Sequence, residues 1–471
     1  MGVIGIDLGT TGARSIVYDD QYNTLCERYE EYPILTPRPG WAEQDAGLWW
    51  SLTASVARSA VLGAGGAIHP IRAIGISSQG ISFVPVDKGF KPLRNAVSWL
   101  DVRADTEISE ILQCFDEQTV FLKTGKRASA AYTLPKLLWL KKKEPETLSR
   151  CAYILMPHDF LIANMTGSAI TDHSLASGTM LYDLEKADWS EEMLSAFKLP
   201  IARLPNLFRG GQPAGELTES AAAEMGLTPG VIVTTGGQDQ KCAAFAAGLD
   251  IGTATVSLGT AAAVTILETE SAAGACLPRF AYFKPGVFVR EGSVMTAGMA
   301  LRWLRDIIRP GMPYSELSAL AEPHAGASEV IFAPHLQGSA YPSWNTRTRG
   351  SFHGLTLSAG VGELVLAVME AIAFEIKRNI EAVGSSAVQK LRVFGGGANS
   401  GLWRQIIADA SGLPVERAVS SEMACLGAAM LAGKACGLPA PQKTAPAGIH
   451  EPDPALSAYY NEKYARYQII A

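Results

Sequence analysis

Short apolar runs separated by polar, glycine-rich loops are the main pattern along the chain. Near its start, residues 3–6 and 13–18 are two such runs, and the segment 7–12 between them reads Asp-Leu-Gly-Thr-Thr-Gly. Two apolar runs joined by a short loop with glycine are typical of a β-hairpin. The pattern therefore predicts a hairpin whose turn is polar and made of small residues.

The same pattern returns at the midpoint of the chain. Residues 254–266 again give an apolar run, Leu-Gly-Thr, small residues and a second apolar run. A repeat with strand-like runs on both sides is harder to obtain by chance than Leu-Gly-Thr alone. We therefore expect two related α/β domains, residues 1–246 and 247–471, each of which opens on such a hairpin.

Helical spacing of apolar residues and further short apolar runs extend these predictions along both halves. Helices are predicted at residues 49–62, 133–143, 296–308, 361–382, 403–410 and 425–435. Strands are predicted at residues 71–76, 83–86, 231–235 and 391–394. The last helix is rich in small residues, with Gly427, Ala428 and Ala429, and such a helix can pack closely on its neighbour.

Length and composition narrow the class of protein. The 471 residues are too many for one ordinary core, and 48% hydrophobic against 18% charged residues suits a large, well-buried enzyme. The formal net charge of −6 argues against a nucleic-acid partner. No stretch of about 18 uncharged apolar residues predicts a membrane span, and the start of the chain lacks the basic region of a secretory signal. We therefore expect a cytoplasmic protein that works without a membrane or a nucleic acid.

Cysteine usage fits the same compartment. The seven cysteines are scattered, odd in number and never spaced as CxxC: Cys26, Cys114, Cys151, Cys242, Cys276, Cys425 and Cys436. This pattern predicts reduced, mostly buried thiols. The histidines show no metal-binding spacing, so we predict no zinc site.

The first loop has the composition of a phosphate-binding turn. Glycine lets backbone N–H groups approach an anion, as at Gly9, and the hydroxyls of Thr10 and Thr11 add donors. Arg14 follows the loop as a partner for phosphate, and Asp7 before it can hold Mg²⁺ through water. One loop alone is equally consistent with an ordinary hairpin turn. Two such loops that face each other across a cleft are the arrangement needed to grip a polyphosphate from both sides.

Asp239 is the best candidate for a general base. It follows a predicted strand and the pair Gly236-Gly237, and open α/β sheets place their ligands at the carboxyl ends of their strands. A carboxylate there can accept the proton of a hydroxyl that attacks a phosphoryl group. The alternative is an aspartate that only caps a turn.

Two further segments have the composition of ligand contacts. Trp99, Asp101 and Arg103 place an aromatic ring, an acid and a base together, a set that can bind a polyol, although a surface ion pair beside a core tryptophan is the alternative. The three glycines at 395–397 follow a predicted strand and either admit a flat or charged ligand or make a tight turn. The GxxxxGK[ST], GxGxxG and GxSxG motifs of other enzyme classes are absent.

Taken in order, five segments resemble the motifs of the FGGY carbohydrate kinases, members of the actin-like ATPase superfamily. The five are residues 7–12, 99–103, 236–239, 257–260 and 395–403. Each is weak alone, but five in order at sensible spacing extend the resemblance over nearly the whole chain. Thr124-Gly125 and the segments 135–140 and 188–190 are similar to xylulokinase-type members in particular.

The resemblance implies two ribonuclease-H-like α/β domains that close on MgATP across a cleft and exclude water. Asp239 would be the catalytic base, and Asp7 and Asp239 would hold Mg²⁺ through water. Phosphate groups would bind at Gly9, Thr10, Thr11, Arg14, Gly259 and Thr260. The adenosine site would be lined by Gly298, Gly395, Gly396, Gly397, Ala398 and Asn399. Sugar contacts would come from Gln79, Trp99, Asp101, Arg103 and Asp239.

The implied activity is ATP-dependent phosphorylation of a hydroxyl on a small sugar, a ketopentose such as xylulose or a related ketose or polyol. The resemblance also suggests a homodimer. Xylulokinases usually read Gln-Met-His-Gly where this chain has Gln-Gly-Ile-Ser at 79–82, so Gly80 and Ile81 lose a polar contact or leave it to another residue. The family's later Ser-Gly-Glu-Arg-x-Pro pattern is Gln-Gly-Ser-Ala-Tyr-Pro at 337–342. Because such contacts decide specificity, the acceptor stays open and includes glycerol, gluconate and tetruloses.

Two other classes of function share parts of this pattern. The segment 4–11 also resembles the opening of Hsp70 chaperones, which carry a further peptide-binding domain for which this chain leaves no room after residue 440. A sugar sensor that binds without transfer is the other alternative, and the presence of Asp7, Asp239 and both Gly-Thr loops argues against it. Substrate-stimulated ATP turnover distinguishes the kinase from both.

Overall fold

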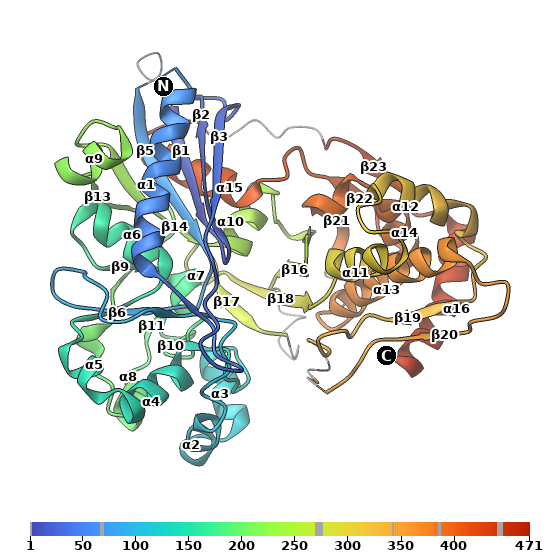
Figure 1. The fold of residues 1–471 in the computed structure, drawn as a ribbon, viewed down its shortest axis with the longest axis horizontal. Helices are drawn as coiled ribbons and strands as arrows, with labels where there is room; N and C mark the ends of the chain where they lie inside the picture. Colours follow the sequence, from blue (N-terminus) through green and yellow to red (C-terminus); the bar gives the residue numbers. More distant parts are fainter. Residues whose placement is uncertain are drawn as a thin grey trace. The chain divides into compact units, whose positions relative to one another are not determined.

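The computed structural model describes residues 2–65, 70–268, 277–341, 343, 345, 347–384, 388–439 and 446–471. Cys276 lies outside the described residues, and the six cysteines within them are free thiols. Contacts divide the chain into two compact units, whose elements are labelled in Figure 1. Unit 1 contains Met1–Ala246, Arg279–Phe288 and Ala424–Gln442, and unit 2 contains Ala247–Pro278, Val289–Met423 and Lys443–Ala471.

Unit 1 is built on a mixed sheet with the strand order β13-β14-β5-β1-β2-β3. Its strands are β1 Gly2–Leu8, β2 Gly12–Tyr18, β3 Thr24–Glu31, β5 Ile71–Ser78, β13 Pro213–Glu216 and β14 Ile232–Gln238. β1, β5 and β14 run parallel, whereas β2, β3 and β13 are antiparallel to their neighbours. The predicted N-terminal hairpin is β1–β2, and its parallel neighbours bring the ends of β5 and β14 to the same edge of the sheet.

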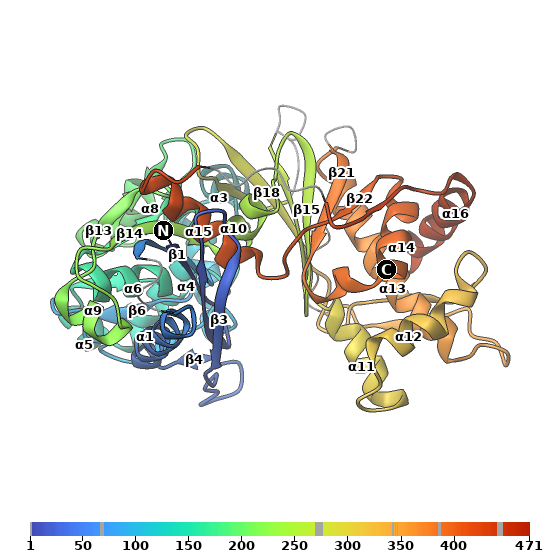
Figure 2. The same cartoon turned by 90° about the horizontal axis from the view of Figure 1, so that it is seen from above.

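Helices cover both faces of this sheet because alternate residues of β1 point to opposite sides. Ile4 and Ile6 pack in one core with α1 (Ala46–Gly63), α6 (Pro157–Thr166) and α9 (Glu219–Met225). Val3 packs with α15 (Met423–Ala435) on the other face, and Figure 2 shows α1 and α15 on different sides of β1. The α1 helix starts three residues before its predicted start because Asp45 accepts a hydrogen bond from Gly47 N–H and caps it.

The close packing expected of the small-residue helix is seen in α15. The backbone carbonyls of Cys425 and Ala428 lie so near Gly5 and Gly75 that a Cβ at either glycine would collide with them. The helix therefore rests directly on the backbone of β1 and β5, which is why contacts group this segment of the second half with unit 1.

Shorter elements complete unit 1. Its other helices are α2 Glu107–Cys114, α3 Glu117–Thr124, α4 Thr133–Lys143, α5 Pro145–Arg150, α7 His173–Ala176, α8 Glu191–Ala196 and α10 Asp239–Ala246. Its short strands are β4 Glu43–Gln44, β6 Val84–Val86, β7 Ala96–Val97, β8 Tyr153–Leu155, β9 Ile170–Asp172, β10 Tyr182–Asp183, β11 Asp188–Trp189, β12 Asn206–Phe208 and β17 Arg279–Ala281. The predicted helix 133–143 coincides with α4.

Unit 2 repeats the sheet of unit 1. Within the described residues the sheet has seven strands, of which β17 is the first. The six that belong to unit 2 follow in the order β18 Phe288–Val294, β16 Ala262–Leu267, β15 Gly252–Leu258, β21 Val388–Phe394, β22 Val415–Arg417 and β23 Ile449–His450. β15, β21 and β22 are parallel and the others antiparallel, so the order and directions equal those of β3-β2-β1-β5-β14-β13. The predicted two-domain α/β fold with a hairpin in each sheet is confirmed, whereas the bounds 1–246 and 247–471 stay a prediction.

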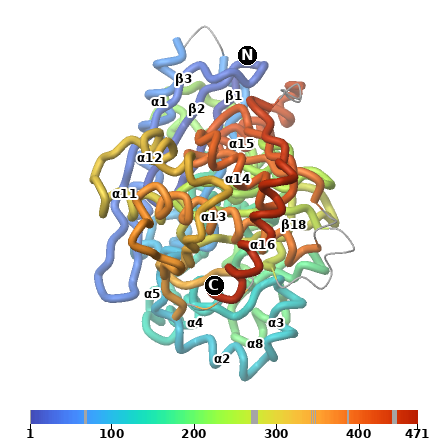
Figure 3. Tube along the Cα trace, turned by 90° about the vertical axis from the view of Figure 1, so that its right-hand side faces the viewer, coloured from blue at the N-terminus to red at the C-terminus, as the bar shows by residue number. Residues whose placement is uncertain are grey.

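The helices of unit 2 gather around α13. They are α11 Gly298–Ile308, α12 Tyr314–Ala321, α13 Val361–Glu381, α14 Gly401–Ser411 and α16 Pro454–Ile470. α13 contacts α11, α12 and α14, and α14 in turn contacts α16, as Figure 3 shows. The short strands β19 Ile331–Ala333 and β20 Ser351–His353 form a separate antiparallel pair.

Candidate active site

The carboxyl ends of β1, β5 and β14 bring the two candidate carboxylates of unit 1 to one edge of the sheet. Asp7 near the end of β1 is opposite Ser77 in β5, and Ser77 Oγ donates to Asp7 Oδ1 at 2.8 Å. Asp239 follows β14 directly and starts α10. Burial raises the pKa of the Cys242 thiol well above its usual value, and the charges of Asp172, Asp7 and Asp239 raise it further. Both carboxylates therefore lie around the same buried thiol.

Asp239 is half-buried and held by its neighbours in the chain. Its Oδ1 accepts from Gln240 N–H at 2.6 Å and from the side-chain amide of Gln238. The preceding pair Gly236-Gly237 is enclosed, because a Cβ at Gly237 would lie 2.6 Å from a ring carbon of Phe283. Glycine is needed before the candidate base because a side chain would collide with its neighbours, and not because the backbone adopts a positive φ.

The loop between β1 and β2 is held by hydrogen bonds to its carbonyl groups. Tyr32 N–H donates to Thr11 O at 3.0 Å, the Tyr32 hydroxyl donates to Gly9 O, and Gln44 Nε2 donates to Thr10 O at 2.6 Å. Gly9 N–H closes the turn by donating to the Gly12 carbonyl at 3.0 Å. With the carbonyls engaged, the threonine hydroxyls and the N–H groups after Gly9 are the donors that the loop can offer an anion.

Gln79 lies behind this loop and is only 2% exposed. Its side-chain Nε2 donates to Gln44 Oε1 at 3.0 Å and to the Tyr32 hydroxyl at 3.3 Å, and its Oε1 accepts from Ser82 Oγ at 3.2 Å. The residue predicted to contact sugar is therefore part of the network that holds the loop. Tyr32 and Gln44 were missed by sequence reasoning, because single polar residues in such positions carry no motif.

Arg14 on β2 has protein partners on β3. Its guanidinium forms an ion pair with Glu27 and lies 4.8 Å from the ring centroid of Tyr29. Both charged side chains are partly exposed, which makes this pair weak and open to exchange. The predicted contact between Arg14 and phosphate stays a prediction.

Trp99 connects the second predicted segment to the first loop. Its indole Nε1 donates to Thr10 Oγ1 at 3.0 Å, and its backbone N–H donates to Ser82 Oγ at 2.9 Å. Its side chain is partly exposed. The structure thus brings together two residues that lie 89 positions apart in the sequence.

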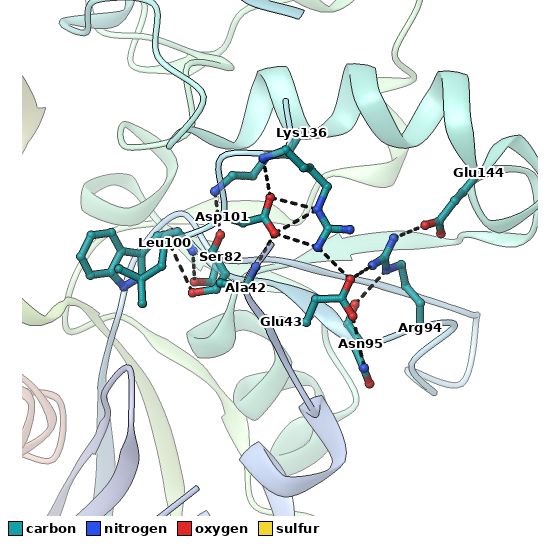
Figure 4. Close-up of polar contacts among 12 residues, drawn as sticks. Ala42, Glu43, Ser82, Arg94, Asn95, Leu100, Asp101, Lys136 and Glu144 are labelled. Atoms are coloured by element: carbon teal, nitrogen blue, oxygen red, sulfur yellow. Dashed lines mark hydrogen bonds and ion pairs between the residues drawn. The ribbon is translucent and has the colours of Figure 1, made fainter. Parts of the chain in front are cut away.

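Asp101 and Arg103 form a buried ion pair, and Figure 4 shows the polar contacts around Asp101. The Asp101 carboxylate accepts from Ala42 N–H at 2.6 Å, from Arg103 N–H at 2.9 Å and from the guanidinium at 2.7 Å. The Arg103 side chain is fully buried, contacts Glu43 at 2.8 Å and lies 3.7 Å from the ring centroid of Trp41. Within the described residues, Arg103 Nη1 has no hydrogen-bond partner. Both side chains are directed at the protein rather than at an open surface.

Lys136 lies beside this pair and is also buried (Figure 4). Its Nζ donates to the backbone carbonyls of Ser98 and Ala131, both at 2.7 Å. Burial lowers the pKa of Lys136 to about 7, while the Asp101 charge raises it and the Arg103 charge lowers it further. The lysine ties α4 to the residue before Trp99.

In unit 2 the predicted residues gather where β15 ends. Gly259 N–H closes its turn by donating to Ala261 O at 3.1 Å, as Gly9 does in the first loop. Gly298 N–H donates to Gly259 O at 2.9 Å, and Met299 N–H donates to Thr260 O at 3.0 Å. A Cβ at Gly298 would lie 2.6 Å from Gly259 O. The start of α11 therefore packs on the loop between β15 and β16, which is the second loop of the repeat.

The three glycines after β21 are not equivalent. Gly395 has φ +90°, and a Cβ there would lie 2.9 Å from Leu258 O, while a Cβ at Gly397 would lie 2.6 Å from the Leu258 side chain. A Cβ at Gly396 would meet nothing within 4 Å. Ala398 is buried and Asn399 exposed, at the end of the short helix Gly396–Asn399. This turn packs against the same strand end as the second loop.

The donor set of unit 1 fits a magnesium ion bound largely through water. Among the residues with assigned positions, no group of three or more His, Cys, Asp or Glu side chains could hold a metal. Mg²⁺ needs only one or two carboxylates when substrate phosphates and water supply the other ligands, and Asp7 and Asp239 have that chemistry. In the same part of the chain, none of the helices is both long and apolar enough to cross a membrane.

Residues 2–246 match the N-terminal domain of the FGGY family of carbohydrate kinases, and residues 254–436 match its C-terminal domain. Over 444 residues the chain is 32% identical to the xylulose kinase of Lactococcus lactis, with 93% of this chain and 88% of that protein covered. It is 31% identical over 466 residues to the glycerol kinase of Acidovorax sp., with 93% and 91% covered. The crystal structure of a xyloylose kinase from Brucella ovis is 30% identical, with a TM-score of 0.91 over 100% of this chain and 98% of that chain.

Proposed function

The chain belongs to the FGGY family of carbohydrate kinases, and on this basis we propose that it transfers the γ-phosphoryl group of ATP to a hydroxyl of D-xylulose. The relatives named as xylulose kinases favour this ketose. The observation that carries the proposal is the shared edge of the unit 1 sheet. Asp7 near the end of β1, the first loop after β1 and Asp239 after β14 all lie at the carboxyl ends of its parallel strands.

Asp239 acts as the general base in this proposal. Its carboxylate accepts the proton of the acceptor hydroxyl as the oxygen attacks the γ-phosphorus, and the bond from phosphorus to the bridging oxygen of ADP breaks. Asp7, with Asp239, would hold Mg²⁺ through water, and the bound ion would supply neutralisation of charge on the phosphates. Thr10 and Thr11 donate to phosphate oxygens from the loop whose carbonyls are held by Tyr32 and Gln44.

The remaining predicted residues fall into two groups. In unit 2, we assign phosphate binding to Gly259 and Thr260 and the nucleoside to Gly298 and to residues 395–399. In unit 1, Trp99 offers its partly exposed ring to the acceptor, and Arg14 can exchange Glu27 for phosphate. Gln79, Asp101 and Arg103 are buried and hydrogen-bonded within the protein, so we give them the role of holding the loop and the Trp99 segment.

Family membership also motivates two statements about the protein's setting. We infer that the chain is a homodimer and that it acts in the cytoplasm on a small, freely diffusing sugar. Light scattering on the purified protein tests the first inference, since a dimer has twice the mass of the 50.1 kDa chain. Cell fractionation tests the second.

The experiment that tests the proposal measures ADP release with MgATP and a panel of acceptors. The panel contains D- and L-xylulose, both ribuloses, a tetrulose, gluconate and glycerol, because one relative of similar identity is a glycerol kinase. We expect D-xylulose to stimulate ADP release, and the Asp239→Asn variant to lower kcat by about 10²- to 10⁴-fold.

The matched control is Asp87→Asn, which alters another turn aspartate of unit 1, one that accepts from Gly89 and Lys91 N–H groups. This variant should keep the full rate. Stimulation by glycerol or gluconate alone would replace the substrate but keep the kinase. Stimulation that survives in Asp239→Asn would remove Asp239 as the base, and the absence of stimulation by any acceptor would leave a sugar sensor or an Hsp70-like ATPase.

A further inference from the structure

The turn that carries Asp239 is built on a β-bulge. Along the parallel pair of β14 and β5 the register shifts between Thr235 and Gly237, so Gly236 is an extra residue in β14. A Cβ at Gly236 would collide with the carbonyl oxygen of Ile76, so the bulge requires glycine there. Bulges re-aim the side chains that follow them, and they leave backbone groups that need partners outside the ladder.

One of these backbone groups is held from α6. Gly236 N–H donates to His158 Nε2 at 3.3 Å, and Nδ1 of the same ring lies 3.1 Å from Asp159 Oδ1. Nε2 accepts a hydrogen bond only in the neutral ring with its proton on Nδ1, and this tautomer donates to Asp159. Asp159 is in turn anchored, because its Oδ2 accepts from Met156 N–H at 2.9 Å at the start of the helix. His158 and Asp159 are both fully buried.

The other backbone group is held from the start of α7. Gln238 N–H donates to Ser174 Oγ at 3.0 Å, and the Ser174 hydroxyl donates to Asp172 Oδ1. The same carboxylate oxygen accepts from Leu175 N–H at 3.1 Å. Asp172 and Ser174 are fully buried. In both places a carboxylate orients a side chain, and that side chain accepts a hydrogen bond from one backbone N–H of the turn.

We infer that His158 and Ser174 are positioning residues for phosphoryl transfer, which hold the backbone on either side of Gly237 and so aim the Asp239 carboxylate. The inference rests on the proposed function in one respect, the role of Asp239 as the base. Neither side chain touches the acceptor or the nucleotide in this scheme, since both act through backbone N–H groups. A base displaced by about 1 Å from its proton loses on the order of a hundredfold in rate.

Four substitutions separate the role of these side chains as hydrogen-bond acceptors from the effect of their size. Ser174→Ala and His158→Leu remove the hydrogen-bond acceptor, whereas Ser174→Thr and His158→Gln keep an oxygen that can accept the backbone N–H. Thr234→Val is the matched control, because it removes a buried hydroxyl of β14 that donates to Ile74 O at 3.1 Å, before the bulge. For each variant we would measure kcat, the KM values for MgATP and D-xylulose, and the melting temperature, and we would determine a crystal structure.

We expect Ser174→Ala and His158→Leu to lower kcat ten- to a hundredfold while both KM values change less than threefold. The Thr and Gln variants should recover most of the rate, and Thr234→Val should lower the melting temperature but keep kcat. In the crystal structures the Asp239 carboxylate should be displaced in Ser174→Ala and unmoved in Thr234→Val.

The inference is overturned if Asp239 keeps its place in the Ser174→Ala and His158→Leu structures, or if these variants lose stability as Thr234→Val does with kcat intact. Failure of the proposed function is a separate result, in which the unsubstituted protein shows no acceptor-stimulated ADP release. The crystal structures decide the inference in that case as well, because they report the position of Asp239 without turnover. If either Ser174→Ala or His158→Leu does not fold, the other of these two variants supplies the same comparison.

Discussion

The indole Nε1 of Trp99 donates a hydrogen bond of 3.0 Å to the hydroxyl of Thr10. The first residue belongs to the segment predicted to contact the acceptor, and the second to the loop predicted to bind phosphate. The backbone of Trp99 is attached in turn to Ser82, whose hydroxyl donates to Gln79 in the network behind the loop. One hydrogen bond thus couples the two halves of the proposed reaction within unit 1.

Removing this bond should weaken ATP binding more than acceptor binding. Trp99→Phe keeps an aromatic ring but loses the donor, so the Thr10 hydroxyl is no longer held in one orientation. A net hydrogen bond contributes about 1 kcal/mol, and we therefore expect the KM for ATP to rise about fivefold. Steady-state kinetics with ATP and D-xylulose varied in turn measure both KM values.

The control for this prediction is a double-mutant cycle with Thr10→Val. Because the valine has no hydroxyl to hold, Trp99→Phe should add little to the KM for ATP in the Thr10→Val background. Additive effects of the two substitutions would show that Trp99 acts on ATP binding by another route.

The three glycines after β21 give a test of the nucleoside site that does not depend on folding. A Cβ at Gly396 has open space, so Gly396→Ala should change the free energy of unfolding by less than about 0.5 kcal/mol. If the segment lies against the nucleotide, the added methyl group should raise the KM for ATP several-fold and leave the KM for D-xylulose unchanged. Urea unfolding and kinetics on the same preparation measure the two effects.

Gly395→Ala is the contrasting variant. Its φ of +90° and the nearby Leu258 carbonyl should make the substitution cost about 1–3 kcal/mol of stability. An unchanged KM for ATP in a stable Gly396→Ala variant would remove this segment from the nucleoside site.

The strands and helices that matter most for the site could be predicted from the sequence because their signals are local. The apolar runs on either side of residues 7–12 and 259–261 form the hairpins β1–β2 and β15–β16. The helix predicted at 133–143 from its apolar spacing has the same bounds as α4. The repeated Leu-Gly-Thr predicted the duplication, which the matching strand order of the two sheets confirms.

The side-chain partners of the site could not be predicted, because they join residues far apart in the chain. Asp101 and Arg103 read as an exposed polar set, yet Ala42, Glu43 and Trp41 enclose them from a segment without any motif. Gly9 reads as a donor to phosphate, yet its N–H closes its own turn. The bulge at Gly236 has no sequence signal besides the second glycine, and its partner His158 lies on a helix 78 positions earlier.

The buried pair of Asp101 and Arg103 predicts a loss of stability rather than of substrate affinity. Asp101→Asn replaces one acceptor oxygen by a donor that faces the guanidinium and leaves Glu43 as the carboxylate still paired with Arg103. Breaking a buried ion pair in this way costs about 3–5 kcal/mol, so the melting temperature should fall clearly. Where the variant is still folded, the KM for D-xylulose should change less than threefold.

The comparison that sharpens this prediction is Arg38→Ala, which removes a guanidinium that lies 4.8 Å from the same Trp41 ring but has no place in the ion pair. Its stability should change little. A tenfold rise in the KM for D-xylulose in Asp101→Asn, with the melting temperature unchanged, would instead establish the direct sugar contact suggested by the motif.

Lys136 predicts how stability depends on pH. Its pKa is about 7 in the folded protein and 10.5 in the unfolded chain, because burial disfavours the charged ammonium. Between these two values the unfolded chain binds more protons than the folded protein, so the free energy of unfolding rises with pH across this window. The slope from one such group is at most about 1.4 kcal/mol per pH unit. Below pH 7 both states are protonated, and the full cost of the buried charge is present.

Lys136→Met isolates this contribution, because every other titrating group is retained. The methionine also loses the hydrogen bonds to Ser98 O and Ala131 O, but neutral lysine keeps donors for both carbonyls, so that loss is a constant offset. Urea unfolding at pH 7.5 and at pH 9.5 should therefore show the unsubstituted protein gaining stability on the variant as the pH rises. Parallel stabilities at the two pH values would mean that Lys136 stays charged in the folded protein, held by Asp101 against the cost of its burial.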